Sequence, residues 1–135
     1  MSQHTNQHTN QHQYSDQLGF LRVAFHKQLE LNEKIGHDLL IIKSDIVKRE
    51  RFTKEYILAA IDELFEVLHE TNWKIWKQQK KEITEKDIKK IQEELVDVFH
   101  FYINLCILWD MTPDILEEVY LHKNAINHKR QDAGY

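Results

Sequence analysis

The chain has 135 residues, 41% of them hydrophobic, so it is long enough to bury a core as a single domain. Its 22 acidic and 18 basic residues give a net charge of −4, which excludes a general electrostatic attraction to nucleic acid, and we expect no nucleic-acid partner. The sequence shows no signal-peptide pattern and no apolar run approaching the ~20 residues of a membrane span, so we expect a cytoplasmic protein without a membrane partner. The single cysteine, Cys106, lies in an apolar helical run and is expected to be a buried small hydrophobe in a reducing compartment.

The N-terminal segment repeats a His-Thr-Asn-Gln unit and contains no aliphatic residue after Met1. Such a segment cannot offset the entropy lost on ordering. We therefore expect a disordered tail over residues 1–14, followed by a single helical domain over residues 15–135.

The first helix is predicted to run from Ser15, as its N-cap, to about Ile35, and to stop at Gly36. Gln28 and Asn32 occupy positions on its apolar stripe where leucine would be usual. Buried amides present both hydrogen-bond donors and acceptors, which reading the edge of a nucleobase requires. The alternative is that neighbouring helices satisfy these two amides.

The next helix carries the first acidic pair. Residues 37–51 are partly apolar and then basic, which fits a short helix followed by a linker, and Thr53 is expected to cap the helix that follows. Glu63 and Glu66 are three positions apart and so share one helix face. Charged residues usually form a solvated face, but apolar residues cover much of this helix, which favours an interior cleft. The expected core stripe consists of Ile57, Ala60, Ile61, Leu64 and Leu68.

A segment rich in tryptophan and lysine, residues 73–83, connects this helix to a second acidic helix. Its tryptophans and lysines are suited either to covering a phosphate-bearing ligand or to packing on the end of the helices. Thr84 and Asp87 approximate a capping box, so a long helix is predicted from Thr84 to Trp109.

The second acidic pair, Glu94 and Asp97, lies on this long helix. His100 follows one turn beyond Asp97. Phe101 lies on the same helix face as the acidic pair, where it is either a core residue or an aromatic surface on which a base can stack. The expected core stripe of this helix consists of Ile88, Ile91, Leu95, Val98, Tyr102, Leu105 and Trp109.

If the two acidic pairs face each other, four carboxylates share a small volume and cannot all stay ionised unless a cation neutralises them. Oxygen ligands suit Mg²⁺, or Mn²⁺, rather than zinc, which favours nitrogen and sulfur. The pattern therefore predicts a metal site and metal-assisted chemistry on a phosphate-bearing substrate.

The last helix is predicted to begin with Thr112 as N-cap and Pro113 at the first helical position. A polar and basic stripe follows at spacings of three and four. Its cations would either hold phosphates bridged by the metals or simply complement the helix dipole. The stripe consists of Tyr120, Lys123, Asn127 and Arg130.

In combination, these motifs resemble the all-α NTP pyrophosphatase superfamily, which includes the MazG-related enzymes and the dimeric dUTPases. The shared order is ExxE, then 27 residues, then ExxD on two long helices, a moderately specific pattern. Three further patterns make the resemblance to the dimeric dUTPase branch quite specific, from about residue 18 to residue 135. They are Gln28-x-x-x-Asn32, Lys74-x-Trp76-Lys77 and Tyr120-x-x-Lys123-Asn124-x-x-Asn127-x-x-Arg130-Gln131-x-x-Gly134-Tyr135.

The resemblance implies an all-α bundle of four to five helices that forms a homodimer. It implies hydrolysis of dUTP to dUMP and pyrophosphate, through attack of a metal-activated water on the α-phosphate, with dUDP as an additional candidate substrate that would give dUMP and phosphate. The implied catalytic residues and Mg²⁺ ligands are Glu63, Glu66, Glu94 and Asp97. The implied contacts of the uracil and deoxyribose are Gln28, Asn32, His100 and Phe101. The remaining implied substrate contacts are Tyr120 together with Lys123, Asn127 and Arg130 on the phosphates, and Lys74 and Trp76 closing the cleft.

Three alternatives stay open at this point. A dCTP or broader NTP pyrophosphatase would use the same residues, because an amide such as Gln28 can turn either its donor or its acceptor toward the base. A di-iron carboxylate bundle is suggested by the acid-x-x-His patterns that begin at Glu66 and Asp97, although that fold takes glutamates from two further helices. A non-catalytic helical interaction module would leave the acids as solvated faces.

Overall fold

The structure is a computed structural model that describes residues 19–134. Within these residues the chain forms five α-helices and no strand, which confirms the predicted all-α class. The described residues divide into two compact units, one made of residues 19–38 and 109–134 and the other of Leu39–Leu108. The predicted disordered tail and the predicted cap at Ser15 lie outside the described residues.

The first unit contains α2 (Phe20–Lys34) and α6 (Pro113–Asp132). Helix α2 begins at Phe20, with Gly19 as its N-cap residue. Gly19 has a φ of 76°, which is outside the helical region and marks this start. The predicted end is confirmed: the last helical residue is Lys34, and Gly36 has a φ of 83°.

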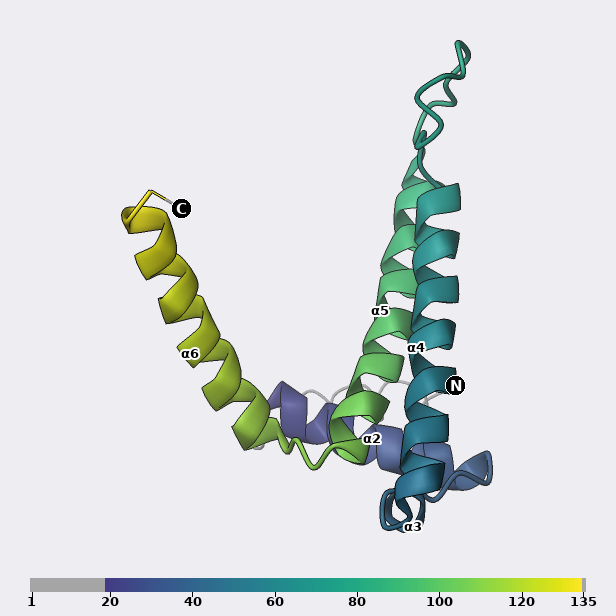
Figure 1. The fold of residues 1–135 in the computed structure, drawn as a ribbon. Coiled ribbons are helices and arrows are strands. Elements are labelled where there is room, and N and C mark those ends of the chain that lie inside the picture. Colours follow the sequence, from purple (N-terminus) through teal and green to yellow (C-terminus); the bar gives the residue numbers. More distant parts are fainter. Residues whose placement is uncertain (1–18, 135) are drawn as a thin grey trace, which may run out of the picture. The chain divides into compact units, whose positions relative to one another are not determined.

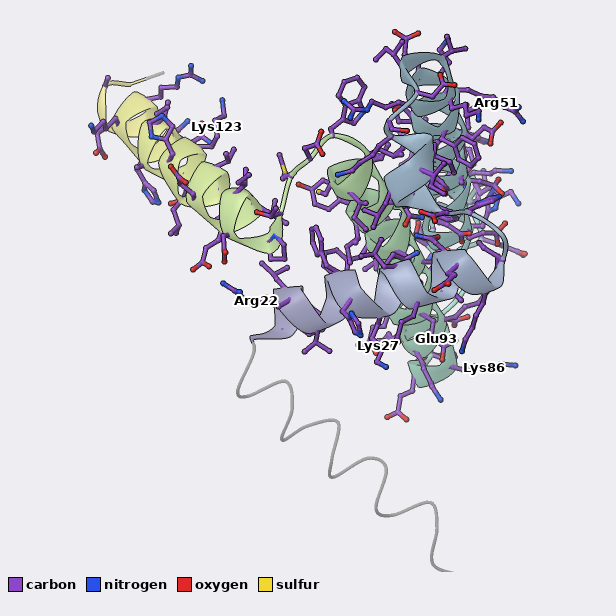
Figure 2. All side chains as sticks on the ribbon, turned by 90° about the horizontal axis from the view of Figure 1, so that it is seen from below. Arg22, Lys27, Arg51, Lys86, Glu93 and Lys123 are labelled. Atoms are coloured by element: carbon purple, nitrogen blue, oxygen red, sulfur yellow. The ribbon has the colours of Figure 1, made fainter. Side chains whose placement is uncertain are left out.

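Helix α6 begins as predicted, with Pro113 in the first turn and the Thr112 hydroxyl accepting a hydrogen bond from the Ile115 amide at 3.3 Å. Its first turn lies beside the first turn of α2, where Arg22 and Asp114 form an exposed ion pair at 2.5 Å (Figure 2). Helix α6 has no buried residue among those described. Its polar stripe therefore faces solvent within this structure.

The second unit contains α3 (Leu39–Ile42), α4 (Ile46–His69) and α5 (Glu85–Leu108). Helices α4 and α5 run antiparallel and lie side by side, joined by a long connection at one end (Figure 1). The capping box of α5 is confirmed: the Thr84 amide donates to the Asp87 carboxylate at 2.9 Å, and the Asp87 amide donates back to the Thr84 hydroxyl at 3.3 Å.

The predicted start of α4 is wrong. Asp45 is the cap, and its carboxylate accepts from the amides of Val47 and Lys48 at 3.0 and 3.2 Å. Thr53 lies inside the helix, where its hydroxyl donates to the Arg49 carbonyl at 2.7 Å. The basic run before Thr53 consists of lysine, arginine and glutamate, which are good helix formers, so it extends α4 by two turns instead of forming a linker.

The predicted core stripes are also partly wrong. On α4, Ile57, Ile61 and Leu64 are 42–48% exposed, whereas Tyr56, one position earlier, is buried. On α5, several stripe residues are likewise exposed, and burial concentrates near its C-terminal end. The exposed members of that stripe are Ile88, Leu95, Tyr102 and Trp109, and the buried residues of α5 are Ile103, Asn104, Cys106, Ile107 and Leu108. The burial expected for Cys106 is confirmed.

No single helix among residues 19–134 combines the length and the apolar character of a membrane span. Helices α5 and α6 reach that length and apolar character only when they are counted together across the break between them. The buried core helices of other proteins meet the same criterion, so it is weak support for a membrane span.

Candidate metal centre

The acidic pairs lie where α4 and α5 face each other. Glu63 and Glu66 on α4 and Glu94 and Asp97 on α5 are all half-buried. Each pair spans about one turn, so both of its members can point toward the opposite helix. The antiparallel packing of the two helices therefore brings the ExxE and ExxD motifs to the same place along the pair.

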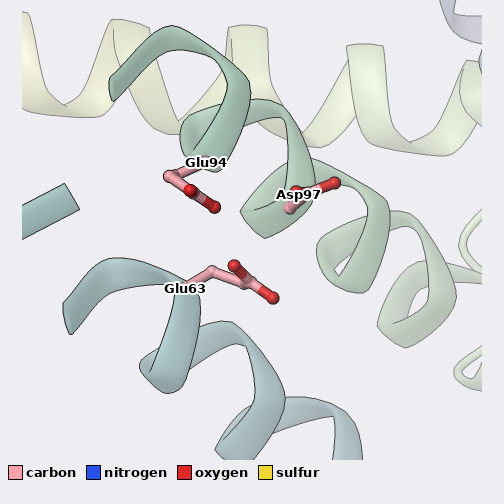
Figure 3. Close-up of side chains that lie close together, drawn as sticks. All are labelled: Glu63, Glu94 and Asp97. Atoms are coloured by element: carbon pink, nitrogen blue, oxygen red, sulfur yellow. The ribbon is translucent and has the colours of Figure 1, made fainter. Parts of the chain in front are cut away.

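Three of the four carboxylates converge. One oxygen each from Glu63, Glu94 and Asp97 lies within 4.8 Å of the other two (Figure 3). Glu66 lies one turn along α4 and is not a member of this close group. We call the three converging residues the acidic cluster.

The acidic cluster carries unfavourable electrostatics of its own. Partial burial raises the pKa of Glu63 above its ordinary value, and the hydrogen bond with Glu94 and the charges of Asp97 and Glu94 raise it further. A raised carboxyl pKa means that this position favours the neutral acid over the anion. A cation bound between the three carboxylates would reverse that preference.

Lys90, which the sequence patterns had not singled out, lies next to the acidic cluster together with Glu70, which shares the helix line of Glu63 and Glu66. Lys90 on α5 pairs with Glu70 on α4 at 2.6 Å, and this contact, with smaller effects from Glu66 and Glu94, raises the pKa of Lys90. The same contact with Lys90 lowers the pKa of Glu70. The spacing of four between Lys90 and Glu94 was the available signal, because residues four apart share a helix face.

His100 and Phe101 continue the acidic face of α5. The Nδ1 atom of His100 lies 3.5 Å from a carboxylate oxygen of Asp97, and His100 is half-buried. Phe101 packs at a tilted angle near Tyr56 of α4, with 6.1 Å between ring centroids. The structure therefore brings His100 to the acidic cluster and places Phe101 in the packing between the two helices.

Lys74 and Trp76 lie in the connection between α4 and α5. Trp73 and Trp76 meet edge to face with centroids 5.7 Å apart, and the Lys74 ammonium lies 5.1 Å from the Trp73 ring centroid. Trp76 remains 69% exposed, so its indole is available for a further contact.

The other predicted substrate contacts belong to the unit that contains α2 and α6. Gln28 and Asn32 are buried, as the stripe predicted, and the Gln28 amide donates to the Asn32 side-chain oxygen at 3.4 Å. The α6 residues Tyr120, Lys123, Asn127 and Arg130 are all exposed, and Figure 2 shows Lys123 on the surface of its helix.

The donor set of the acidic cluster fits a hard divalent cation. Its side chains offer only carboxylate oxygens, which Mg²⁺ and Mn²⁺ prefer, and no cysteine or histidine belongs to the close group among the described residues. Oxygens on opposite sides of a Mg²⁺ ion are about 4.2 Å apart, so small side-chain movements would bring the three carboxylates into range.

Comparison with known proteins identifies the family. The family model described as dUTPase matches residues 20–114, which is more than half of the chain and includes both acidic motifs. The chain belongs to this dUTPase family. The family resemblance drawn from the sequence motifs is thereby confirmed. The dUTPase match ends in the first turn of α6, so the polar stripe of that helix lies beyond it.

Two phage proteins are similar to this dUTPase-family chain. A dCTP pyrophosphatase of Enterobacteria phage LZ5 is 39% identical over 72 residues, which cover 45% of this chain and 42% of that protein. A dCTP pyrophosphatase of Enterobacteria phage T4 is 33% identical over 115 residues, which cover 73% of this chain and 67% of that protein. The chain thus spans less than half of one relative and about two thirds of the other. No solved structure matches it.

Proposed function

We propose that this protein is a divalent-metal-dependent pyrophosphohydrolase of pyrimidine deoxynucleoside triphosphates, releasing pyrophosphate and the nucleoside monophosphate. The observation that carries the proposal is the convergence of Glu63, Glu94 and Asp97 from two antiparallel helices. Membership of the dUTPase family, and the names of the two phage relatives, support the same class of reaction.

The residues of the acidic cluster would hold Mg²⁺, or Mn²⁺, between their three carboxylates. The bound ion supplies charge neutralisation for phosphate and lowers the pKa of a water. Glu66 is half-buried and outside the close group, which leaves its carboxylate available to orient the attacking water or accept its proton. Lys90, held by Glu70, adds a positive charge beside the carboxylates where phosphate oxygens would approach.

The base is proposed to be uracil or cytosine. The family description names dUTP hydrolysis, whereas both relatives are named for dCTP. The two bases differ at the edge where a carbonyl and an N–H are exchanged for an amino group and a lone pair, and an amide such as Gln28 can serve either arrangement. We therefore expect turnover of both dUTP and dCTP, and the deoxyribose to distinguish both from UTP.

A substrate panel tests this proposal. Pyrophosphate release would be measured for dUTP, dCTP, dTTP and UTP with Mg²⁺, with Mn²⁺ and with EDTA. We expect dUTP and dCTP to be hydrolysed only with a divalent ion, and Asp97→Asn to abolish both reactions. Release that survives EDTA, or that is equal for UTP, would contradict the proposed metal site or the proposed substrate class.

A second candidate, the di-iron bundle, is disfavoured by the side chains around the acids. His69, three positions after Glu66, is exposed and stacks on Phe65 with ring centroids 6.5 Å apart. The close group of possible ligands among the described residues contains three carboxylates and no histidine. Iron-dependent oxygen consumption without pyrophosphate release would restore this candidate.

We further propose that two copies of the chain pair through the exposed apolar stripes of α4 and α5. On α4 the stripe contains Ile57, Ile61 and Leu64, and on α5 it contains Ile88, Leu95 and Tyr102, all more than 40% exposed. Contiguous apolar surface on helices of this length marks an association surface. Because a two-fold dimer buries the same patch on both copies, one self-complementary stripe is sufficient. Sedimentation of a monomer at micromolar concentration would contradict this proposal.

A further inference from the structure

Buried packing between α4 and α5 lies on only one side of the acidic cluster. Within the described residues, no side chain of α4 after Tyr56 and none of α5 before Ile103 is buried. The contact between Tyr56 and Phe101 also lies toward the C-terminal end of α5. Interdigitated side chains normally set the register of two helices, meaning how far they are displaced along each other. On the other side of the cluster, another interaction has to take that role.

Four charged side chains join the two helices on that other side. Lys90 of α5 pairs with Glu70 at 2.6 Å, and Glu70 is the C-cap residue of α4. Lys81, in the connection, pairs with the same Glu70 at 3.4 Å and with Asp87 of α5 at 3.1 Å. We call these four residues, which alternate in sign, the charge network. Its two carboxylates are largely enclosed, because only 16% of the Glu70 side chain and 20% of the Asp87 side chain are exposed.

Further contacts hold the charge network in place. The Asp87 carboxylate also accepts from the backbone amide and the hydroxyl of Thr84, at 2.9 and 2.8 Å. The Asn72 side chain donates to the Lys81 carbonyl at 2.8 Å and accepts from the Lys81 amide at 3.1 Å. These contacts fix the backbone of Lys81 and the carboxylate of Asp87. The Glu70 carboxylate is therefore held from the connection and from α5 at once.

The Glu70–Lys90 pair lies one helical turn from both acidic motifs. Glu70 follows Glu66 by four residues and Lys90 precedes Glu94 by four, so each shares a helix face with an acidic motif. A slip of α4 against α5 by one residue is a displacement of about 1.5 Å. The oxygens of the acidic cluster lie within 4.8 Å of one another, and Mg²⁺ takes oxygen ligands only at about 2.0–2.1 Å. A slip of that size would therefore take a carboxylate out of range.

We propose that the Glu70–Lys90 pair sets the register of α4 against α5 and thereby positions the acidic cluster for a divalent ion. Both are positioning residues, which act through Glu63, Glu94 and Asp97. Ion pairs of this exposure contribute little to stability, but an ionic or polar pair can specify how two helices align. The proposal rests on the metal centre of the proposed function and is independent of which nucleotide is the substrate.

Replacing Lys90 by glutamine separates positioning from simple electrostatics, because the two predict opposite signs. The pair with Glu70 raises the pKa of Lys90 most, and the charges of Glu66 and Glu94 raise it further. If Lys90 acted only as a nearby positive charge, its removal would strengthen the binding of a divalent cation. If it sets the register, Lys90→Gln should weaken that binding by about tenfold, as the loss of groups that orient metal ligands commonly does.

The measurement is Mn²⁺ binding to the full chain, followed by the electron paramagnetic resonance signal of the free ion. Glu70→Gln should weaken binding by a similar factor, and Lys90→Arg, which keeps the charge, should retain most of the affinity. The double variant Glu70→Gln, Lys90→Gln should lose no more than either single variant, because both changes break the same pair. Lys86→Gln is the matched control, because it removes the same charge from an exposed residue of α5 outside the charge network (Figure 2).

Four results would overturn the proposal: unchanged or tighter Mn²⁺ binding by Lys90→Gln, an equal loss in Lys86→Gln, a double variant whose loss is the product of the two single losses, or loss of the helices in either single variant by circular dichroism in EDTA. A parent chain that binds no Mn²⁺ would overturn the proposed function as well. A parent that binds Mn²⁺ and hydrolyses its substrate, with variants that bind equally well, would overturn the register proposal alone.

Discussion

Replacing Glu63 by glutamine should have opposite effects on stability with and without metal. The side chain keeps its size and hydrogen-bonding reach but loses its charge. In the parent protein the negative charge of Glu63 is repelled by the negative charges of Glu94 and Asp97. Burial is the largest cause of the raised pKa of Glu63, and this repulsion raises the pKa further. Without metal the glutamine variant should therefore be more stable than the parent, and with metal it should be less stable.

The size of the effect follows from the geometry. Oxygens of Glu63 lie within 4.8 Å of oxygens of Glu94 and Asp97. Two unit charges at that separation repel by about 1 kcal/mol in a water-like medium and by about 3 kcal/mol at an effective dielectric constant of 20. The lower value applies because the acidic cluster is only half-buried. Salt screening then reduces the summed repulsion of Glu63 with Glu94 and of Glu63 with Asp97 to about 1 kcal/mol. That corresponds to a rise in Tm of about 4 °C in EDTA.

Added metal should make the parent more stable than the Glu63→Gln variant. Mg²⁺ at a hundred times its dissociation constant should stabilise the parent by about 2.7 kcal/mol, whereas a variant that binds it poorly gains little. The assay is thermal unfolding followed by circular dichroism at pH 7, in EDTA and across a Mg²⁺ titration. Glu93→Gln is the matched control, because Glu93 neighbours Glu94 on α5 but is exposed and outside the acidic cluster (Figure 2).

The pH dependence of stability independently tests whether the charge of Glu63 destabilises the metal-free protein. A carboxyl group whose folded-state pKa is raised contributes stability at low pH that is lost as the pH rises through that pKa. For Glu63 this loss should occur above the ordinary value of 4.5 and should be absent from the glutamine variant in EDTA. A Glu63→Gln protein that melts earlier than the parent in EDTA, or that keeps the full Mg²⁺-induced shift, would refute the reasoning.

Three further predictions concern the fold and its association. Asp45→Ala should lower the free energy of unfolding by about 1 kcal/mol, because it removes the acceptor of two first-turn amides of α4, whereas Thr53→Ala should have a smaller effect; urea unfolding compares the two. Burial, aided by Glu55, raises the pKa of Tyr56 to about 12, so stability should fall as the pH rises from 10 to 12, and Tyr56→Phe should weaken this dependence in alkaline melts. Ile61→Lys on the exposed stripe of α4 should convert a dimer to a monomer in sedimentation velocity, while Lys54→Gln should not; an unchanged dimer would exclude this stripe from the interface.

The sequence alone determined the features that depend on near neighbours in the chain. Thr84 and Asp87, and Thr112 and Pro113, mark helix starts because their capping contacts form within three residues. Gly36 marks a helix end because glycine, which has no Cβ, adopts a positive φ readily. The local signals gave the wrong helix start where two candidate caps were present. Asp45 and Thr53 are both residue types that can cap a helix, and only Asp45 caps α4.

The spacing of the acids also predicted the acidic cluster, because three-residue separations fix which side chains share a helix face. It did not determine how far each of them reaches. Glu63, Glu94 and Asp97 converge, while Glu66 lies a turn away, near Lys90. That distinction depends on how far α4 and α5 are displaced along each other, which no spacing within a single helix encodes.

The tertiary structure alone decided which face of each helix is covered. On α4 the apolar stripe through Ile57 and Ile61 and the face with Tyr56 and Glu63 are one residue out of phase, about 100° around the axis. The hydrophobic pattern favours burial of the stripe through Ile57 and Ile61, yet the face with Tyr56 and Glu63 is the more buried of the two. Burial depends on what lies opposite a helix face, and that is a property of the packed chain and of any partner it binds, whereas periodicity is a property of one helix.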